Sequence, residues 1–148
     1  MTPSLWWSKV DLTLESPSYG TQHSVGLDLP ARETVRLQYG EYALIPLNLV
    51  VKPPEGYFCL LVPRSSTYGK RGLLMANSVG IIDPDFCGPA DELGALVVNM
   101  HPQQLPTVVR RGDKLFQLLL LPALRPTLQF VSDPMGPSRG GVGSTDKE

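Results

Sequence analysis

The sequence predicts an all-β domain, and three observations support this prediction. Prolines (15) and glycines (14) together make up close to one in five of the 148 residues. Both interrupt helices, because proline lacks the amide hydrogen and glycine costs about 1 kcal/mol in a helix interior. The longest segment free of both runs only over residues 4–16. Short apolar segments separated by turn residues recur along the chain, which is typical of a sandwich, jelly roll or barrel.

Composition narrows the class of protein further. A hydrophobic fraction of 42% with 18% charged residues suits one globular domain. A net charge of −1 argues against nucleic acid or an anionic membrane as a partner. No segment approaches the roughly 20 apolar residues of a membrane span, and residues 1–10 lack the features of a signal peptide. Because Cys59 and Cys87 are isolated, we expect free thiols and a cytoplasmic location.

In the first half of the chain, we expect four strands. The alternation of Val10, Leu12 and Leu14 with polar residues predicts a half-buried strand, and residues 25–29 repeat the pattern. Apolar residues fill 42–51 and 57–62, on either side of a segment that contains two prolines and a glycine. These two runs are therefore predicted to form a hairpin.

The second half continues in the same way. Residues 73–82 and 93–100 are expected to form another β pair, with at most one short helix before them, near residues 65–70. A hairpin turn is predicted at residues 111–113, leading into a strand over 114–121, and residues 127–131 are expected to close the ordered body. The resulting division is a catalytic domain over 1–133 and a flexible, glycine-rich tail over 134–148, which cannot build a core of its own.

One candidate site follows the strand that ends at Pro63. Arg64, Ser65 and Ser66 provide a guanidinium and two hydroxyls there. A serine can cap a helix start, and an arginine can bind phosphate through two hydrogen bonds, so the segment can form an anion site. The alternative is a plain helix cap beside a surface arginine.

A second candidate site contains two carboxylates, Asp83 and Asp85, at the end of an apolar run. A carboxylate held at a strand end can orient and deprotonate a water molecule, and the neighbouring Phe86 can pack against a sugar or base. The alternative is a solvated turn, which an Asp-Pro sequence favours.

Two further segments carry polar or flexible groups in unusual places. Gln117 lies among leucines, where its amide needs hydrogen-bond partners, either from the backbone or from a ligand. Residues 139–145 contain three glycines whose amides can form a concave site for phosphate oxygens, the alternative being a disordered polar tail.

Taken in order, these segments resemble the five motifs of the trimeric dUTP pyrophosphatase (dUTPase) family. The match covers about residues 24–145, and its motifs are residues 24–29, 63–66, 77–88, 111–117 and 140–145. The resemblance implies a distorted jelly-roll or β-clip subunit that forms a homotrimer. Each active site would draw on three chains, with the glycine tail of one chain closing over a pocket built by the other two.

The implied reaction is hydrolysis of dUTP to dUMP and pyrophosphate by water attack on the α-phosphorus, with Mg²⁺ held by the triphosphate rather than by protein ligands. Asp83 corresponds to the water-activating aspartate. The implied phosphate contacts are Arg64, Ser65, Ser66 and Gln117, with Asp28 in a supporting role. The implied nucleoside contacts are Asn77, Ile81, Ile82 and Phe86. The implied tail contacts are Arg139, Gly140, Gly141, Val142, Gly143, Ser144 and Thr145.

The sequence departs from the family pattern at four places, one of which is Arg139, which lies closer to the glycine pair than the family's usual arginine. Val142 stands where a phenylalanine typically stacks on uracil, a difference worth about 1–3 kcal/mol of binding. Phe86 stands where the family usually has tyrosine, and residues 89–92 form a small acidic insertion.

Two rival functions remain. One is a dCTP deaminase of the same fold, which requires a glutamate where Leu96 stands, although Glu92 lies nearby. The other is a nucleotide-binding regulatory protein without turnover.

Overall fold

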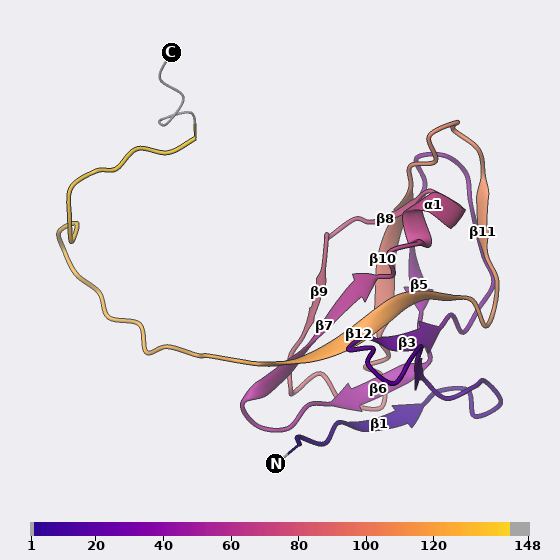
Figure 1. The fold of residues 1–148 in the computed structure, drawn as a ribbon, viewed down its shortest axis with the longest axis horizontal. Coiled ribbons are helices and arrows are strands. Elements are labelled where there is room, and N and C mark those ends of the chain that lie inside the picture. The colour runs from indigo at the N-terminus through magenta and orange to yellow at the C-terminus, as the bar shows by residue number, and fades with distance from the viewer. Residues whose placement is uncertain (1, 143–148) are drawn as a thin grey trace.

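The computed structural model describes residues 2–142, which contain twelve strands and one short helix (Figure 1). The all-β prediction is confirmed. The helix α1 (Thr67–Arg71) forms where the sequence allowed one, and it ends at Gly72, whose φ of 65° is the left-handed conformation that glycine adopts readily. Within the described residues, no helix has the length and apolar character needed to cross a membrane.

Two sheets provide most of the strands. The larger sheet has the order β2-β3-β12-β7-β9, and the smaller one has the order β5-β10-β8. The strands of the larger sheet are β2 (Ser18–Tyr19), β3 (Leu27–Pro30), β7 (Tyr57–Pro63), β9 (Gly80–Ile82) and β12 (Lys114–Pro122). The strands of the smaller sheet are β5 (Tyr42–Pro46), β8 (Leu73–Met75) and β10 (Gly94–Asn99). Two further pairs complete the body: β1 (Trp6–Lys9) with β6 (Leu49–Lys52), and β4 (Val35–Leu37) with β11 (Thr107–Val109).

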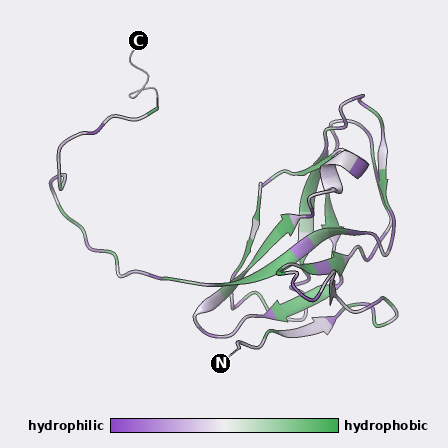
Figure 2. Ribbon diagram, viewed as in Figure 1, coloured by the Kyte–Doolittle hydropathy of each residue, from purple (hydrophilic) through white to green (hydrophobic). Residues whose placement is uncertain are grey.

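The core is built from the inward-facing residues of both main sheets. Leu29, Leu61 and Phe116 come from the larger sheet, and Ile45 and Val97 come from the smaller one; all are at most 1% exposed. Burying each of these side chains contributes about 1.5–3 kcal/mol. The central strands are accordingly the most hydrophobic parts of the ribbon (Figure 2).

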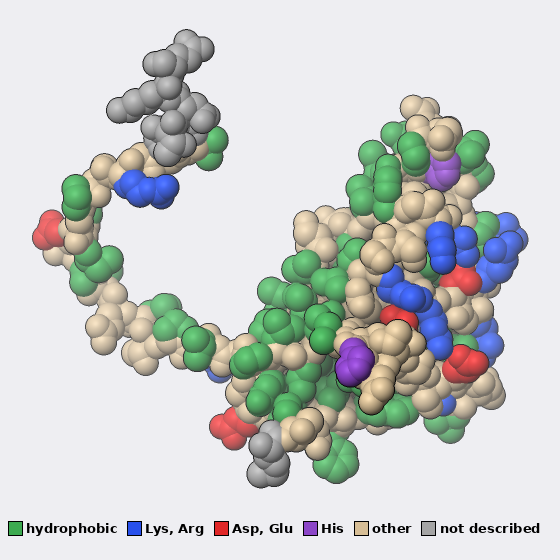
Figure 3. Space-filling model, viewed as in Figure 1, with side chains coloured by type: hydrophobic (Ala, Val, Ile, Leu, Met, Phe, Trp, Pro, Cys, Tyr) green, Lys and Arg blue, Asp and Glu red, His purple; other side chains and the backbone are tan. Residues whose placement is uncertain are grey.

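The opposite face of the larger sheet is also apolar over half its length. Strand register places Leu60 between Ile81 and Leu119, and Phe58 beside Leu121. We call Phe58, Leu60, Ile81, Leu119 and Leu121 the outer apolar face. Ile81 is 65% exposed, and Figure 3 shows hydrophobic side chains gathered over β7, β9 and β12. At the other end of these strands, the same face becomes polar.

The strand predicted from Val10, Leu12 and Leu14 is wrong. The backbone amide and the hydroxyl of Thr13 both donate to Asp11 Oδ1, at 2.9 and 2.6 Å, which folds the segment into a turn. Leu12 is 80% exposed, and only Leu14 reaches the core. The first strand, β1, lies just before this segment.

The hairpin predicted between residues 42–51 and 57–62 is also wrong. The first run is divided at Asn48, a buried residue with φ of 65°. Its side-chain amide donates to the carbonyl of Asp11 and accepts from the amide of the same residue. This contact turns the chain so that β6 pairs with β1, whereas β7 pairs with β12 and β9.

The remaining predictions for the second half have mixed outcomes. Residues 73–75 pair with β10 as expected, although the rest of that run leaves to form β9. Gly112, with φ of 90°, makes the predicted turn, but the strands on its two sides belong to different sheets. No strand forms over 127–131: Leu128 and Phe130 are more than 90% exposed, and the described tail projects away from the body (Figure 1).

Candidate active site

A polar hollow of about 530 Å³ lies at the end of β7. We call it the Arg64 hollow; its lining is Gly20, Thr21, His23, Ser24, Val25, Gly26, Asp28, Arg64, Ser65 and Gln117. Arg64 Nε lies 3.3 Å from Asp28 Oδ1, and Arg64 Nη1 donates to the carbonyl of Lys114 at 3.1 Å. Two contacts thus fix the guanidinium while some of its N–H groups remain able to bind a ligand.

Gln117 enters the hollow because of strand register. It lies opposite Asp28 on β3 and opposite Val62 on β7, on the side of the sheet away from the core. Its Nε2 donates to the carbonyl of Pro63 at 3.2 Å. Gly26 leaves room for this side chain: a Cβ on Gly26 would lie 2.8 Å from Gln117 Cδ, closer than real Cβ contacts.

The two serines of this segment differ in position. Ser65 lines the hollow, whereas Ser66 does not line it and occupies the N-cap position of α1. The side chain of Ser66 does not make the cap hydrogen bond that the sequence led us to expect. Thr67 anchors the helix instead, with a buried hydroxyl that donates to the carbonyl of Leu115.

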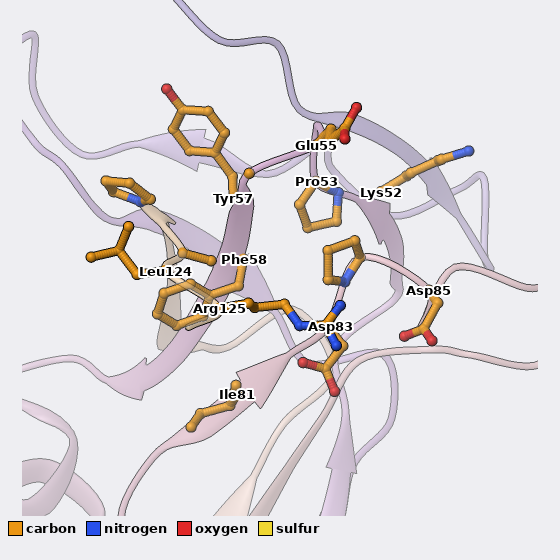
Figure 4. A pocket seen from close by; sticks show the side chains of 14 residues that line it. Lys52, Pro53, Glu55, Tyr57, Phe58, Ile81, Asp83, Asp85, Leu124 and Arg125 are labelled. Atoms are coloured by element: carbon orange, nitrogen blue, oxygen red, sulfur yellow. The ribbon is translucent and has the colours of Figure 1, made fainter. Parts of the chain in front are cut away.

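Asp83 lies in a second hollow, of about 1000 Å³, between β9 and the segment that follows β12. We call it the Asp83 hollow; its lining is Lys52, Pro53, Glu55, Gly56, Tyr57, Phe58, Ile81, Asp83, Pro84, Asp85, Pro122, Ala123, Leu124 and Arg125. Figure 4 shows Arg125 extending from the segment after β12 toward Asp83, with Phe58 close by. Neither Ile82 nor Phe86 lines it, although Phe86 is 40% exposed just beyond Asp85.

The strand beside Asp83 has a free edge. β9 is the last strand of the larger sheet, so one edge of its backbone, at Ile81 and Ile82, faces away from β7. A turn precedes it, in which Ser78 has φ of 64° and Asn77 is exposed at the tip. An edge of this kind presents unpaired N–H and C=O groups to any ligand with complementary ones.

The two hollows lie at opposite ends of β7. Ile82 on β9 pairs with Cys59 on β7, and the two strands are antiparallel, so the next residue, Asp83, lies beside Phe58. Phe58 precedes Arg64 by six positions. At about 3.3 Å per strand residue, Asp83 and Arg64 are about 20 Å apart along the sheet. A base must lie within hydrogen-bond reach of the proton it removes. One chain therefore cannot place both groups on the same reacting phosphate.

The tail residues lie apart from both hollows. Arg139, Gly140, Gly141 and Val142 are exposed and line neither hollow. Gly143, Ser144 and Thr145 lie outside the described residues. Within one chain, the Arg64 hollow and the Asp83 hollow thus each bring together part of the predicted site and leave the tail separate. Apart from those of the tail, the predicted residues that line neither hollow are Ser66, Asn77, Ile82 and Phe86.

The acidic insertion at residues 89–92, which the sequence left unexplained, has a structural role. Asp91 Oδ2 accepts from the amide of Gly88 at 2.7 Å and closes the loop after Asp83. Glu92 holds the guanidinium of Arg32, with Nε–Oε1 at 2.5 Å and Nη2–Oε2 at 3.1 Å. Hydrogen bonding to Glu92 is the main reason why the pKa of Arg32 is raised.

Sequence reasoning missed the contribution of Gly20, Thr21 and His23 to the Arg64 hollow, and it gave no individual role to residues 24–26 of the first motif. Gly26, two positions before Asp28, was the feature of the sequence that could have indicated this part of the hollow. Only the register between β3 and β12, however, shows that Gly26 faces Gln117.

The dUTPase family model matches residues 13–146 of the sequence. The chain belongs to the dUTPase family. The resemblance inferred from the five motifs is thereby confirmed, and the fold is that of the family. A deoxyuridine 5'-triphosphate nucleotidohydrolase of Anaeromyxobacter sp. (strain Fw109-5) is 40% identical over 130 residues, which are 88% of this chain and 85% of that protein.

Solved dUTPase structures agree with this assignment. A mutant dUTPase of Staphylococcus bacteriophage 80alpha with dUpNHpp has a TM-score of 0.84 and 25% identity, covering 97% of this chain and 99% of the other. A mutant dUTPase of phage phi11 of S. aureus, described with a structural Mg(II) ion, has a TM-score of 0.76 and 26% identity, covering 88% and 97%.

Proposed function

We propose that this dUTPase hydrolyses dUTP to dUMP and pyrophosphate as a homotrimer, supplying dUMP and keeping uracil out of DNA. The observation that carries the proposal is the division of the site into two halves of complementary chemistry. A carboxylate beside a free strand edge suits water activation next to a base, and an arginine with a serine and a glutamine suits a phosphate chain. The named function of the 40% identical relative supports the same reaction.

A homotrimer would join the two halves. In a cyclic trimer, a patch on one copy meets a different patch on the next, so the Asp83 hollow of one copy can face the Arg64 hollow of its neighbour. The outer apolar face extends along β7, β9 and β12 from the Asp83 hollow, which Phe58 and Ile81 line, toward the Arg64 hollow. Ile81 is exposed, and the other four residues are half-buried. An exposed apolar patch of this kind is typical of a subunit interface.

In the proposed mechanism, Asp83 accepts a proton from the water that attacks the α-phosphorus, and pyrophosphate leaves. Asn77 and the backbone edge at Ile81 and Ile82 bind the uracil, and Phe86 packs on the deoxyribose where a 2′-hydroxyl would otherwise fit. On the neighbouring copy, the phosphate contacts are Arg64, Ser65, Ser66 and Gln117, with Asp28 holding Arg64 in place. The role of each group in the Arg64 hollow is to hold the phosphates in line for attack.

Mg²⁺ is proposed to bind the triphosphate oxygens and not a protein cage. The donor set of the Arg64 hollow supports this, because its one carboxylate, Asp28, already pairs with Arg64, which leaves no free carboxylate to hold the ion. The other polar side chains of the lining are hydroxyls, the Gln117 amide and the His23 imidazole, which suit phosphate oxygens. The ion would neutralise charge on the phosphates when it is bound.

The tail is proposed to close over a site formed by the other two copies. Residues 134–148 form this closing segment, after a catalytic domain over 1–133. Arg139 and Gly140 to Thr145 would contact the phosphate chain and exclude water. The described part of the tail makes no strand and projects from the body, as a segment that acts on another copy requires (Figure 1).

The deaminase alternative is disfavoured. Glu92, the nearest candidate for its acid, accepts three hydrogen bonds from Arg32, and Leu96 offers no proton donor. We also propose a cytoplasmic location, in keeping with the free thiols of Cys59 and Cys87.

The test is release of pyrophosphate and ammonia from dUTP and dCTP in the presence of Mg²⁺. We expect pyrophosphate from dUTP and no ammonia from dCTP. Asp83→Asn should lower kcat at least about 100-fold while leaving the affinity for dUpNHpp unchanged, because it removes the general base and keeps its size. Asp85→Asn, two positions along in the same hollow, is the matched control and should retain activity. A wild-type chain that binds dUTP but releases no pyrophosphate supports the regulatory alternative.

A further inference from the structure

A histidine borders the Arg64 hollow, and the proposed mechanism does not use it. His23 lies in the loop between β2 and β3 and lines the hollow together with Arg64, Ser65 and Gln117. It is exposed, and within the described part of the chain its imidazole makes no hydrogen bond. Its ring is thus available to a ligand in the hollow.

The loop is shaped without help from the imidazole. The amide of Thr21 donates to Ser24 Oγ at 3.0 Å, and the two hydroxyls lie 2.9 Å apart. The amide of His23 donates to Thr21 Oγ1 at 3.3 Å. Because these contacts use only the backbone of His23, replacing its side chain should leave the loop in place.

The charges around the hollow explain what the histidine can add. Arg64 and Asp28 form an ion pair, and every other lining residue except His23 is uncharged. On the adjoining strand, Lys114 Nζ lies 3.2 Å from Glu15 Oε2 and does not line the hollow. A triphosphate carries several negative charges, and apart from Mg²⁺ and the tail, only Arg64, which is already paired with Asp28, opposes them in the lining. His23 is the lining residue that can supply a second positive charge.

We infer that His23 is a further phosphate-binding residue, whose protonated imidazole donates a hydrogen bond to the triphosphate. The inference rests on the proposed function of this hollow. Histidine gains its proton between about pH 8 and pH 5, whereas carboxylates and guanidinium groups generally keep their charges there. Measurements at two pH values on either side of this range therefore separate a contact that depends on the histidine charge from one that does not.

The experiment compares wild type, His23→Ala and His23→Arg, by titration with inorganic triphosphate and with dUpNHpp at about pH 6 and about pH 8.5. At the lower pH we expect His23→Ala to lower the affinity for both ligands about 5- to 20-fold, because one charge-assisted hydrogen bond is lost. At the higher pH we expect the affinity to change less than about twofold. His23→Arg should bind tightly at both. Gln22→Ala, an exposed neighbour that does not line the hollow, is the matched control and should bind as wild type does.

Unchanged binding in His23→Ala at about pH 6, or an equal loss at both pH values, would overturn the inference. Kinetics add a separate measurement, in which the substitution raises the KM for dUTP and leaves kcat unchanged. Inorganic triphosphate makes the two proposals distinguishable, because its binding requires neither a base nor turnover. A protein that hydrolyses dUTP while His23→Ala binds triphosphate normally refutes only the role of His23. A protein without turnover in which that variant loses triphosphate binding refutes only the proposed reaction.

Discussion

Replacing Gly26 by alanine tests how the Arg64 hollow is assembled. Gly26 is buried, and its φ lies outside the left-handed region, so alanine fits the backbone and the added methyl group is the only change. That methyl would meet three atoms of Gln117: Oε1, Cδ at 2.8 Å and Cβ at 3.2 Å. Because Cβ cannot move far from its strand, Gln117 must rotate its amide away from Pro63.

The expected magnitudes follow from the contacts that are lost. Losing the hydrogen bond from Gln117 to Pro63, together with residual crowding at Cβ, should lower the free energy of unfolding by about 1–3 kcal/mol. Losing one amide contact to a charged phosphate costs about 1.5–3 kcal/mol, which corresponds to about a 10- to 100-fold decrease in kcat/KM.

The assays are thermal unfolding at fixed protein concentration and pyrophosphate release from dUTP. Gln117→Ala is the matched variant, because it removes the obstructing side chain. In that background, Gly26→Ala should cause little further loss of stability or of kcat/KM. The reasoning is refuted if Gly26→Ala keeps kcat/KM within about twofold of wild type, or if it destabilises the protein equally in both backgrounds.

Three further predictions concern other parts of the chain. Hydrogen bonds from the Thr13 side chain, then from Arg111, hold the pKa of Asp11 well below its usual range. Its ionised form therefore stabilises the fold above the unfolded pKa of about 3.9, and the stabilisation is lost as the pH falls through the lower folded pKa. Asp11→Asn should accordingly lower Tm at about pH 7, with a difference that shrinks in acid; a constant difference would contradict this. Burial raises the pKa of the Cys59 thiol to about 11, so an alkylating reagent at about pH 8 should modify the half-buried Cys87 and spare Cys59, as intact mass will show. Deleting the residues after Pro137 should abolish turnover without lowering Tm, because the described tail adds nothing to the core; a large decrease in Tm would assign the tail a structural role.

The sequence predicted the class of fold, the place of the helix and the pairing of β8 with β10, but not how most other strands pair. The apolar run over residues 42–51 has a continuous pattern, and its division depends on the amide of Asn48 meeting a backbone 37 positions earlier. A contact at that distance leaves no local signal. The turn at Asp11 did have one, since aspartate and threonine readily bond to nearby backbone, and the alternation of apolar residues obscured it.

The candidate site shows the same division between local and distant information. Arg64, Asp83 and Gln117 could be proposed from their own segments, because each places a polar group at or within an apolar strand. The pairing of Asp28 with Arg64 and the space that Gly26 leaves for Gln117 come from strand register, which composition does not encode. The glycines of the tail were enough to distinguish it from the folded body. The strand expected at 127–131 did not form, because that segment has no strand partner within the described residues.

The separation of the two hollows along β7 has a genetic consequence. If each site combines Asp83 from one copy with Arg64 from the next, a chain damaged in one hollow is still intact in the other. Consider a cyclic trimer that contains both chains lacking Asp83 and chains lacking Arg64. In such a ring there is always one interface at which a chain that lacks Arg64, and so keeps Asp83, contributes Asp83 to a site whose Arg64 comes from a chain that lacks only Asp83. That junction has both intact halves, so two inactive alleles expressed together would restore one working site in every mixed ring.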